Sequence, residues 1–290
     1  MSPPAKHHPL TSRLHRIWRA ISYRRLRVWL LKKGSLLLEA NAPTMLTGMR
    51  DIKGVSRMRK IIITDLTRFQ NPEIVCTAGT DMKSGACLRP MPYLRTEECE
   101  RLRILPGAIL RGELIPQKGL SGPHQEDARY SKLTFEGPSS SEEFRGALEA
   151  GLHDSVGDGF DITLKSGQKY VPVGHLVGRS IITLSIDPHS IQIIEDRYNP
   201  GKTKIHFVDR SGCEYSYLPI TDLGFHRYAD RHRAAKDLVR LNAFIKNQPQ
   251  AYIRLGLSRA WNNGKVNGYW MQVNGVYTFP EFFEGIRSYK

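Results

Sequence analysis

The 290-residue sequence predicts a mainly β protein of the α+β class, because two runs of short apolar segments follow one another along the chain. The segments are about four to eight residues long and are bounded by Gly, Pro, Asn or Asp, which is typical of strands joined by turns. One amphipathic helix accompanies each run. A hydrophobic content of 40% supplies enough apolar surface for one large core or two small ones.

In the first run, strands are expected at residues 60–64, 74–78, 86–89 and 108–115. A helix is expected next, because Ser139 and Ser140 are followed three residues later by Glu142 and Glu143. This spacing is the capping signal of a helix N-terminus. From Phe144 onward, apolar residues recur on one helical face, which is expected to pack on the strands.

In the second run, strands are expected at residues 181–186, 191–196, 204–208 and 214–218, then a helix at 228–247 and two final strands at 251–259 and 268–279. The helix carries Arg233, Lys236 and Arg240 on a basic face, of the kind that is usually solvated. Short strands with one helix suit small, partly open Greek-key barrels of the OB kind. We therefore expect two OB-like barrels in one compact unit, at residues 58–172 and 173–290.

Residues 1–57 hold most of the net charge of +15 and have only Glu39 and Asp51 as acidic residues. A basic amphipathic helix around residues 14–31 would suit a nucleic-acid arm, a membrane-surface helix or an organelle presequence. However, Met58 leads directly into the apolar run 61–63, as the start of a β-domain would. We therefore interpret residues 1–57 as a basic extension that is disordered or belongs to an over-long N-terminus.

The sequence contains no phosphate-binding glycine loop, no nucleophile elbow and no histidines or cysteines at metal-ligand spacing. We accordingly predict no catalytic residue, no metal site and no cofactor. The four cysteines show no C-x-x-C spacing and are interpreted as reduced thiols in a cytoplasmic protein. No apolar stretch reaches the roughly 20 residues of a membrane span.

The most polar segment of the first run is the loop 123–127, which contains His124, Glu126 and Asp127. We group these residues with Arg89 as a candidate loop contact site, since loops often carry function. A structural or partner-contact role is favoured, because no further ligand or catalytic group lies at a suitable spacing. The alternative is a hydrolase acting on nucleic acid or nucleotides through these side chains.

The two final strands allow each residue to be assigned to a face, because side chains alternate along a strand. If the strands pair as a hairpin about Asn263, their even-numbered residues share one outward face. This face, with Arg259 at its end, is the candidate nucleic-acid site; its residues are Tyr252, Arg254, Arg259, Trp270, Gln272 and Asn274. Such aromatic, basic and amide groups suit single-stranded nucleic acid. The alternative is that the helix 228–247 covers this face and Trp270 is core packing.

Several short segments, taken in order, resemble the prokaryotic dual OB-containing domain family over the chain from Met58 to the C-terminus. They are KIIITD at 60–65, VCTAG at 75–79, LRP at 88–90, PHQED at 123–127, LPITD at 218–222, YIRLGLSR at 252–259 and YWMQVNGVYTFP at 269–280. The resemblance implies two OB-like barrels and a role in nucleic-acid binding, and it brings no catalytic residues. Because barrels of this kind host many functions, the functional implication is an analogy at the level of fold.

The sequence therefore predicts a non-enzymatic, cytoplasmic module that binds single-stranded DNA or RNA, as part of a prokaryotic nucleic-acid-processing or defence assembly. A second hypothesis is a protein–protein adaptor that docks a partner enzyme through the same aromatic residues. Salt dependence of binding separates the two, because phosphate contacts release counterions.

Overall fold

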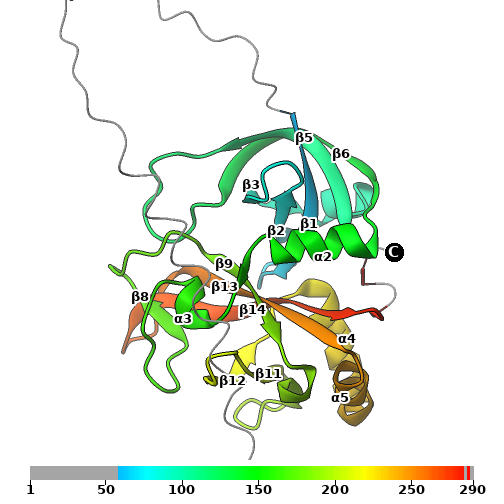
Figure 1. Cartoon of the computed structure of the whole chain (residues 1–290). Helices are drawn as coiled ribbons and strands as arrows, with labels where there is room; N and C mark the ends of the chain where they lie inside the picture. Colours follow the sequence, from blue (N-terminus) through cyan, green and yellow to red (C-terminus); the bar gives the residue numbers. More distant parts are fainter. Residues whose placement is uncertain (1–57, 284–285, 288–290) are drawn as a thin grey trace, which may run out of the picture. The chain divides into compact units, whose positions relative to one another are not determined.

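The computed structural model describes residues 58–283 and 286–287 (Figure 1). The predicted basic extension, residues 1–57, lies outside the described residues. The described chain is mainly β and forms a closed five-stranded barrel and a half-barrel with a few helices. This architecture is consistent with OB-like barrels, and it confirms the predicted fold class.

The first barrel is a ring of five strands in the order β1-β5-β6-β3-β2, closed by the pairing of β2 with β1. The strands are β1 (Met58–Arg68), β2 (Ile74–Asp81), β3 (Cys87–Met91), β5 (Ala108–Pro116) and β6 (Asp127–Pro138). Only the β3–β6 pairing is parallel among these five strands. The short β4 (Leu94–Arg95) adds to β2, and α1 (Thr96–Arg101) follows it.

The second unit has two sheets around one core, in the orders β7-β9-β13-β14-β8 and β10-β11-β12. Its elements are β7 (Leu152–His153), α3 (Val156–Gly159), β8 (Tyr170–Pro172), β9 (Ile181–Ile186), the 3₁₀-helix η1 (Pro188–Ser190), β10 (Gln192–Glu195), β11 (Thr203–Val208), β12 (Glu214–Pro219), α4 (Leu223–Ala234), α5 (Leu238–Lys246), β13 (Gln250–Asn262) and β14 (Asn267–Phe279). The long hairpin β13–β14 lies in the middle of the larger sheet.

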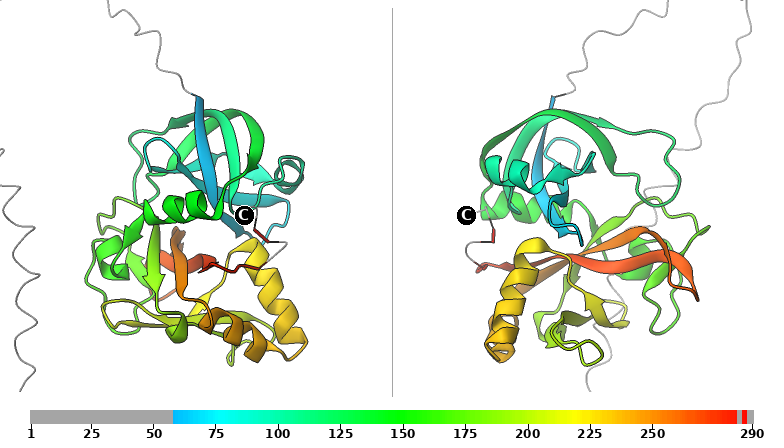
Figure 2. Two further views of the ribbon diagram at one scale, coloured as in Figure 1. Left: turned by 45° about the vertical axis from the view of Figure 1, so that its right-hand side comes forward. Right: turned by 180° about the vertical axis from the view of Figure 1, so that it is seen from behind.

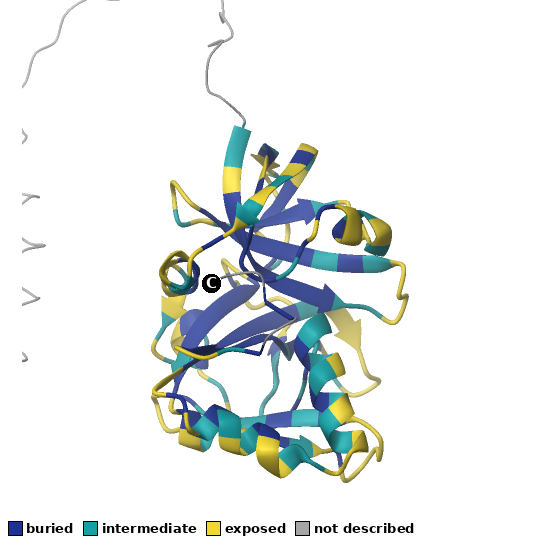
Figure 3. Ribbon diagram, turned by 90° about the vertical axis from the view of Figure 1, so that its right-hand side faces the viewer, coloured by how far each residue is buried: buried dark blue, intermediate teal, exposed yellow. Residues whose placement is uncertain are grey.

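Helix α2 (Ser141–Glu149) joins the two units and lies between them (Figure 2). The predicted capping box is confirmed, because the Ser140 hydroxyl accepts from the Glu143 N–H while the Glu143 carboxylate accepts from the Ser140 N–H. Phe144 and its apolar neighbours form a separate cluster with Tyr252 and Tyr277 of the hairpin. Figure 3 shows buried strands in the centre of both units and exposed residues mainly on helices and loops.

Three predictions about the elements need correction. The helix expected at residues 228–247 is two helices, α4 and α5, because Lys236 between them adopts a left-handed backbone with φ of 55°. Lys236 and Arg240 therefore do not continue a basic face of the helix that carries Arg233. Strand β6 was not expected. The chain also enters the second sheet before the predicted boundary at residue 173, since β7 pairs with β9 and β8 pairs with β14.

None of the described helices is long and apolar enough to cross a membrane. The four cysteines, Cys76, Cys87, Cys99 and Cys213, all lie in the described part of the chain and are free thiols.

Candidate functional site

The predicted outward face of the hairpin must be corrected, because Tyr252, Arg254 and Asn274 are buried. The even-to-even pairing expected along the whole hairpin fails at two places. Asn274 is an extra residue in β14, and a second shift lies between Leu257 and Ala260, beyond which Trp261 pairs with Gly268. Leu255 pairs with Val273, whereas Arg254 pairs with Gly275. A bulge of this kind changes which residues share a face. The first barrel and α2, rather than the basic helix, cover this part of the hairpin.

Arg254 is the charged residue at the centre of the contact between the two units and is only 1% exposed. Its Nη2 lies 2.7 Å from Oδ2 of Asp65 in β1, and its Nε also donates to that carboxylate. Its Nη1 donates to Thr183 Oγ1 in β9, at 2.9 Å. An arginine that is buried and bonded to both units in this way holds them in one arrangement.

The loop contact residues form a second charged connection between the units. Arg89 Nε lies 2.6 Å from Asp127 Oδ1, and Arg259 Nη2 of the hairpin lies 2.9 Å from Asp127 Oδ2. The Glu126 carboxylate accepts from the Ser180 N–H at 2.6 Å and from the Ile181 N–H at 3.1 Å, at the start of β9. Asp127 and Glu126 of the predicted loop contact site are thus bonded to the second unit.

His124 also connects the two units, because its Nε2 lies 3.2 Å from the carbonyl oxygen of Leu257 in β13. A carbonyl oxygen only accepts, so this contact requires the proton on Nε2. Burial, together with the Arg259 and Arg89 cations, lowers the pKa of His124 to about 4. The ring is therefore neutral at neutral pH.

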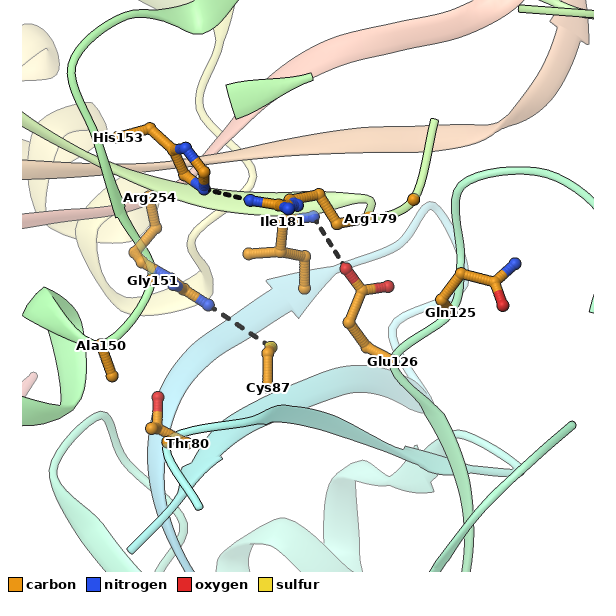
Figure 4. Close-up of a pocket in the computed structure, with 12 residues that line it drawn as sticks. Thr80, Cys87, Gln125, Glu126, Ala150, Gly151, His153, Arg179, Ile181 and Arg254 are labelled. Carbon is orange, nitrogen blue, oxygen red and sulfur yellow. Dashed lines mark hydrogen bonds between the residues drawn. The ribbon is translucent and has the colours of Figure 1, made fainter. Parts of the chain in front are cut away.

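A cavity of about 290 Å³ lies between the two units (Figure 4). Its wall includes Cys87, Glu126, Arg179 and Arg254. Figure 4 shows that their polar groups face partners within the wall: Arg254 contacts the Cys87 sulfur at 3.7 Å, Glu126 binds the Ile181 N–H and Arg179 binds His153. Burial raises the pKa of Cys87 to about 12, so its thiol stays protonated at neutral pH. A protonated thiol is a weak nucleophile, and this cavity is a weak candidate for catalysis.

The accessible part of the predicted face is the outer end of the hairpin, which extends to the edge of the molecule in the right-hand view of Figure 2. Here Trp270 is half-buried, with its ring centroid 5.2 Å from that of Tyr170 and 5.7 Å from that of Trp261. Trp261 is 59% exposed. We call Tyr170, Trp261 and Trp270 the aromatic tip.

The absence of a side chain at Gly268 leaves space for the Tyr170 ring of the aromatic tip. Gly268 pairs with Trp261 across the hairpin, and a Cβ atom at Gly268 would lie 2.9 Å from the Tyr170 ring. Any side chain there would displace that ring, so this position requires glycine. Trp270 is fixed as well, because its Nε1 donates to the carbonyl oxygen of Trp261 at 3.1 Å.

Polar and basic groups lie beside the aromatic tip. Gln272 is half-buried and follows Trp270 on the same face of β14, while Lys265 is exposed in the hairpin turn. The Arg259 side chain is 46% exposed and donates to the Tyr93 hydroxyl at 3.2 Å as well as to Asp127. The structure thus leaves Arg259, Trp270 and Gln272 of the predicted set accessible in part.

Sequence reasoning missed Trp261 and Tyr170. Trp261 lies beyond the predicted end of its strand, and Tyr170 lies before residues 181–186, in a part of the chain for which no strand is predicted. The run Tyr170–Pro172 contains two residues of high β propensity, which could have predicted β8.

No group of three or more His, Cys, Asp or Glu side chains in the described ranges could hold a metal ion. Comparison with known proteins finds no matching family model, no matching curated protein and no matching solved structure.

Proposed function

We propose that this protein is a non-enzymatic module that binds single-stranded nucleic acid, and that the aromatic tip is where bases stack. The observation that carries the proposal is the exposure of Trp261, whose ring lies beside that of Trp270, which in turn lies beside that of Tyr170. Bases stack on exposed aromatic rings with little dependence on sequence, which makes such a surface suitable for single strands. The resemblance of the chain's motifs to the dual OB-containing domain family points the same way.

The charges around the tip support the same proposal. Lys265 is exposed and forms no ion pair with any residue that the structure describes. Arg259 is bonded to Asp127 but keeps nearly half of its side chain in contact with solvent. Cations beside stacking rings are the arrangement in which a phosphate backbone runs along a row of stacked bases.

The test is fluorescence anisotropy of a labelled oligothymidylate or oligouridylate with the full chain and with Trp261→Ala. Loss of one stacking ring is expected to weaken binding by about 1–3 kcal/mol, which is roughly 5- to 150-fold in Kd. Tyr198→Ala is the matched control, because Tyr198 is also an exposed ring but packs on Tyr217 at the opposite sheet. Lys265→Gln should weaken binding and also reduce its salt dependence.

Unchanged binding by Trp261→Ala would exclude the aromatic tip as the site. If the full chain binds neither oligonucleotide at low salt, the nucleic-acid proposal fails. The exposed rings would then favour the adaptor hypothesis, in which a protein partner covers them.

A further inference from the structure

A second and larger cavity, of about 550 Å³, lies between α4 and the first barrel. One face of α4 forms a wall of it, because Leu223, His226, Arg227, Asp230 and Arg231 recur at helical spacing. The facing wall comes from the end of β1, the start of β2 and α1, and it consists of Arg68, Phe69, Pro72, Ile74, Val75 and Thr96. The cavity therefore combines an apolar wall with several cations.

The residues that line this cavity carry more positive than negative charge. Three guanidinium groups, those of Arg68, Arg227 and Arg231, line it with Asp230 as the only carboxylate. Asp230 already accepts from Thr203 and lies 3.2 Å from the Nε2 of His226. None of the three arginines forms an ion pair within the described part of the chain.

Arg68 provides the most specific observation. Its Nε is buried, and among the described residues it has no hydrogen-bond partner. A buried N–H donor without an acceptor is costly, so an acceptor that binds beside it gains stability. An anion in the cavity would supply that acceptor.

We propose that this cavity binds a nucleoside phosphate, with the phosphate on the arginines and the base against Phe69 and the apolar wall. Arginine is the side chain best suited to phosphate oxygens, because its planar group offers several donors. The volume lies within the range of about 300–1,000 Å³ that is typical of small-ligand sites. The ligand has two sources, a free mononucleotide or the terminal nucleotide of a bound strand.

A row of contacts leads from this cavity to Arg259 of the hairpin, two residues before Trp261 of the aromatic tip. The Phe69 ring centroid lies 4.7 Å from that of Tyr93, and the Tyr93 hydroxyl accepts from Arg259 of the hairpin. A strand that stacks on the tip would reach the cavity along these residues. The strand-end source therefore rests on the proposed function, whereas the free-nucleotide source does not.

The first arm of the test is calorimetric titration of the full chain with adenosine monophosphate and, separately, with adenosine. The phosphate is expected to be required, so adenosine should bind much more weakly. The double variant Arg227→Gln, Arg231→Gln should weaken binding of the monophosphate by about tenfold or more, since charge-assisted hydrogen bonds are lost. Arg240→Gln is the control, because Arg240 is an exposed arginine on α5 outside the cavity wall.

The second arm compares an oligonucleotide with a 5′-phosphate, one with a 3′-phosphate and one without a terminal phosphate. The cavity binds a strand end if the full chain prefers one terminal phosphate and two further results hold. The double variant must lose this preference, and Trp261→Ala must keep it. Phe69→Leu tests the base contact and should weaken the monophosphate but not inorganic phosphate. The proposal is overturned if the full chain binds neither the monophosphate nor any terminal phosphate preferentially, or if the double variant, folded by circular dichroism, binds them as the parent does.

Discussion

The inner and outer parts of the β13–β14 hairpin differ sharply in environment although they carry similar residue types. In the inner part, Arg254 is 1% exposed and bonded to Asp65. In the outer part, Arg259 is half-exposed and Trp261 is largely exposed. An arginine and an aromatic residue thus hold two units together in one part of the strand, and the same residue types are free to meet a ligand in the other.

The cause of this difference is how far the first barrel extends over the hairpin. Tyr252 and Tyr277 pack with Phe144 of α2, whereas Trp270 of the aromatic tip packs on Tyr170 of its own sheet. Residue type alone therefore says little about function here. The extent of the covering surface decides which aromatic and basic groups remain available.

The largest expected effect is on the stability of the inner part. Arg254→Met removes the partner of a buried carboxylate, and breaking such a pair costs about 3–5 kcal/mol in the free energy of unfolding. Chemical denaturation of the full chain measures it. Arg259→Met is the matched control on the same strand, and its unfolding free energy should fall by less than about 1 kcal/mol. The Arg259 side chain is half-exposed, and Asp127 would still be paired with Arg89 in this variant.

Two outcomes would contradict the distinction. If Arg254→Met and Arg259→Met lower the free energy of unfolding equally, the inner and outer arginines contribute equally to stability. Failure of the double variant Asp65→Leu, Arg254→Met to recover any stability relative to Arg254→Met would mean that the unpaired carboxylate is not the cause of the loss.

Local signals predicted much of the fold. Strand β9 (Ile181–Ile186) has the predicted bounds, since a run of β-branched and apolar residues lies between turn residues. The capping box at Ser140 was also predicted, because it involves residues only three positions apart. Strand β6 was missed, because only two apolar residues of its 12, Ala128 and Leu133, are buried and its apolar pattern is weak.

Non-local features explain what the sequence did not predict about the site. Arg254 and its partner Asp65 are 189 residues apart, so no spacing rule relates them. The extra residue Asn274 changes the register within an otherwise regular alternation of apolar residues. Trp261 gained its importance only when β8 placed Tyr170 beside Trp270. Pairing between strands that are distant in the sequence thus determines which residues are exposed at the candidate site.

A pH-dependent effect is expected where the inner part ends, at the contact of His124 with Leu257. The pKa of His124 is about 4 in the folded chain against 6.5 ordinarily. Between these values the unfolded chain binds a proton that the folded chain does not, so stability falls as pH falls. His124 should therefore cost about 2–3 kcal/mol of stability between pH 7 and pH 4.

His124→Gln is the variant for this measurement, because the amide can still donate to the Leu257 carbonyl and does not titrate. Denaturation curves of both proteins at several pH values give the difference in unfolding free energy. The titration of the other histidines contributes equally to both proteins and therefore cancels in the difference. If the difference stays constant as pH falls from 7 to 4, the neutral buried ring is not responsible for any loss.

Trp270→Ala lies between the two extremes, because the ring is half-buried against Tyr170 and Trp261. We expect a loss of about 1–2 kcal/mol in stability, below the 3–5 kcal/mol that emptying a core aromatic site costs. Binding of single strands should weaken as well. A loss of stability in the full core range, with strand binding intact in the folded fraction, would place Trp270 with the inner part.

The smallest effect on stability is expected for Trp261→Ala, which lies at the outermost position of the tip. The ring is 59% exposed, and its edge-on contact with Trp270 is the one ring contact that the described residues give it. Its carbonyl, which accepts from Trp270 Nε1, belongs to the backbone and is unaffected by the substitution. The loss in unfolding free energy should stay below about 1 kcal/mol.

A large drop in the affinity for single strands with so small a change in Tm would show that this residue acts in binding and not in folding. A loss of stability as large as that of Trp270→Ala would mean that the ring supports the hairpin, and that a weaker affinity in this variant reports a distorted tip.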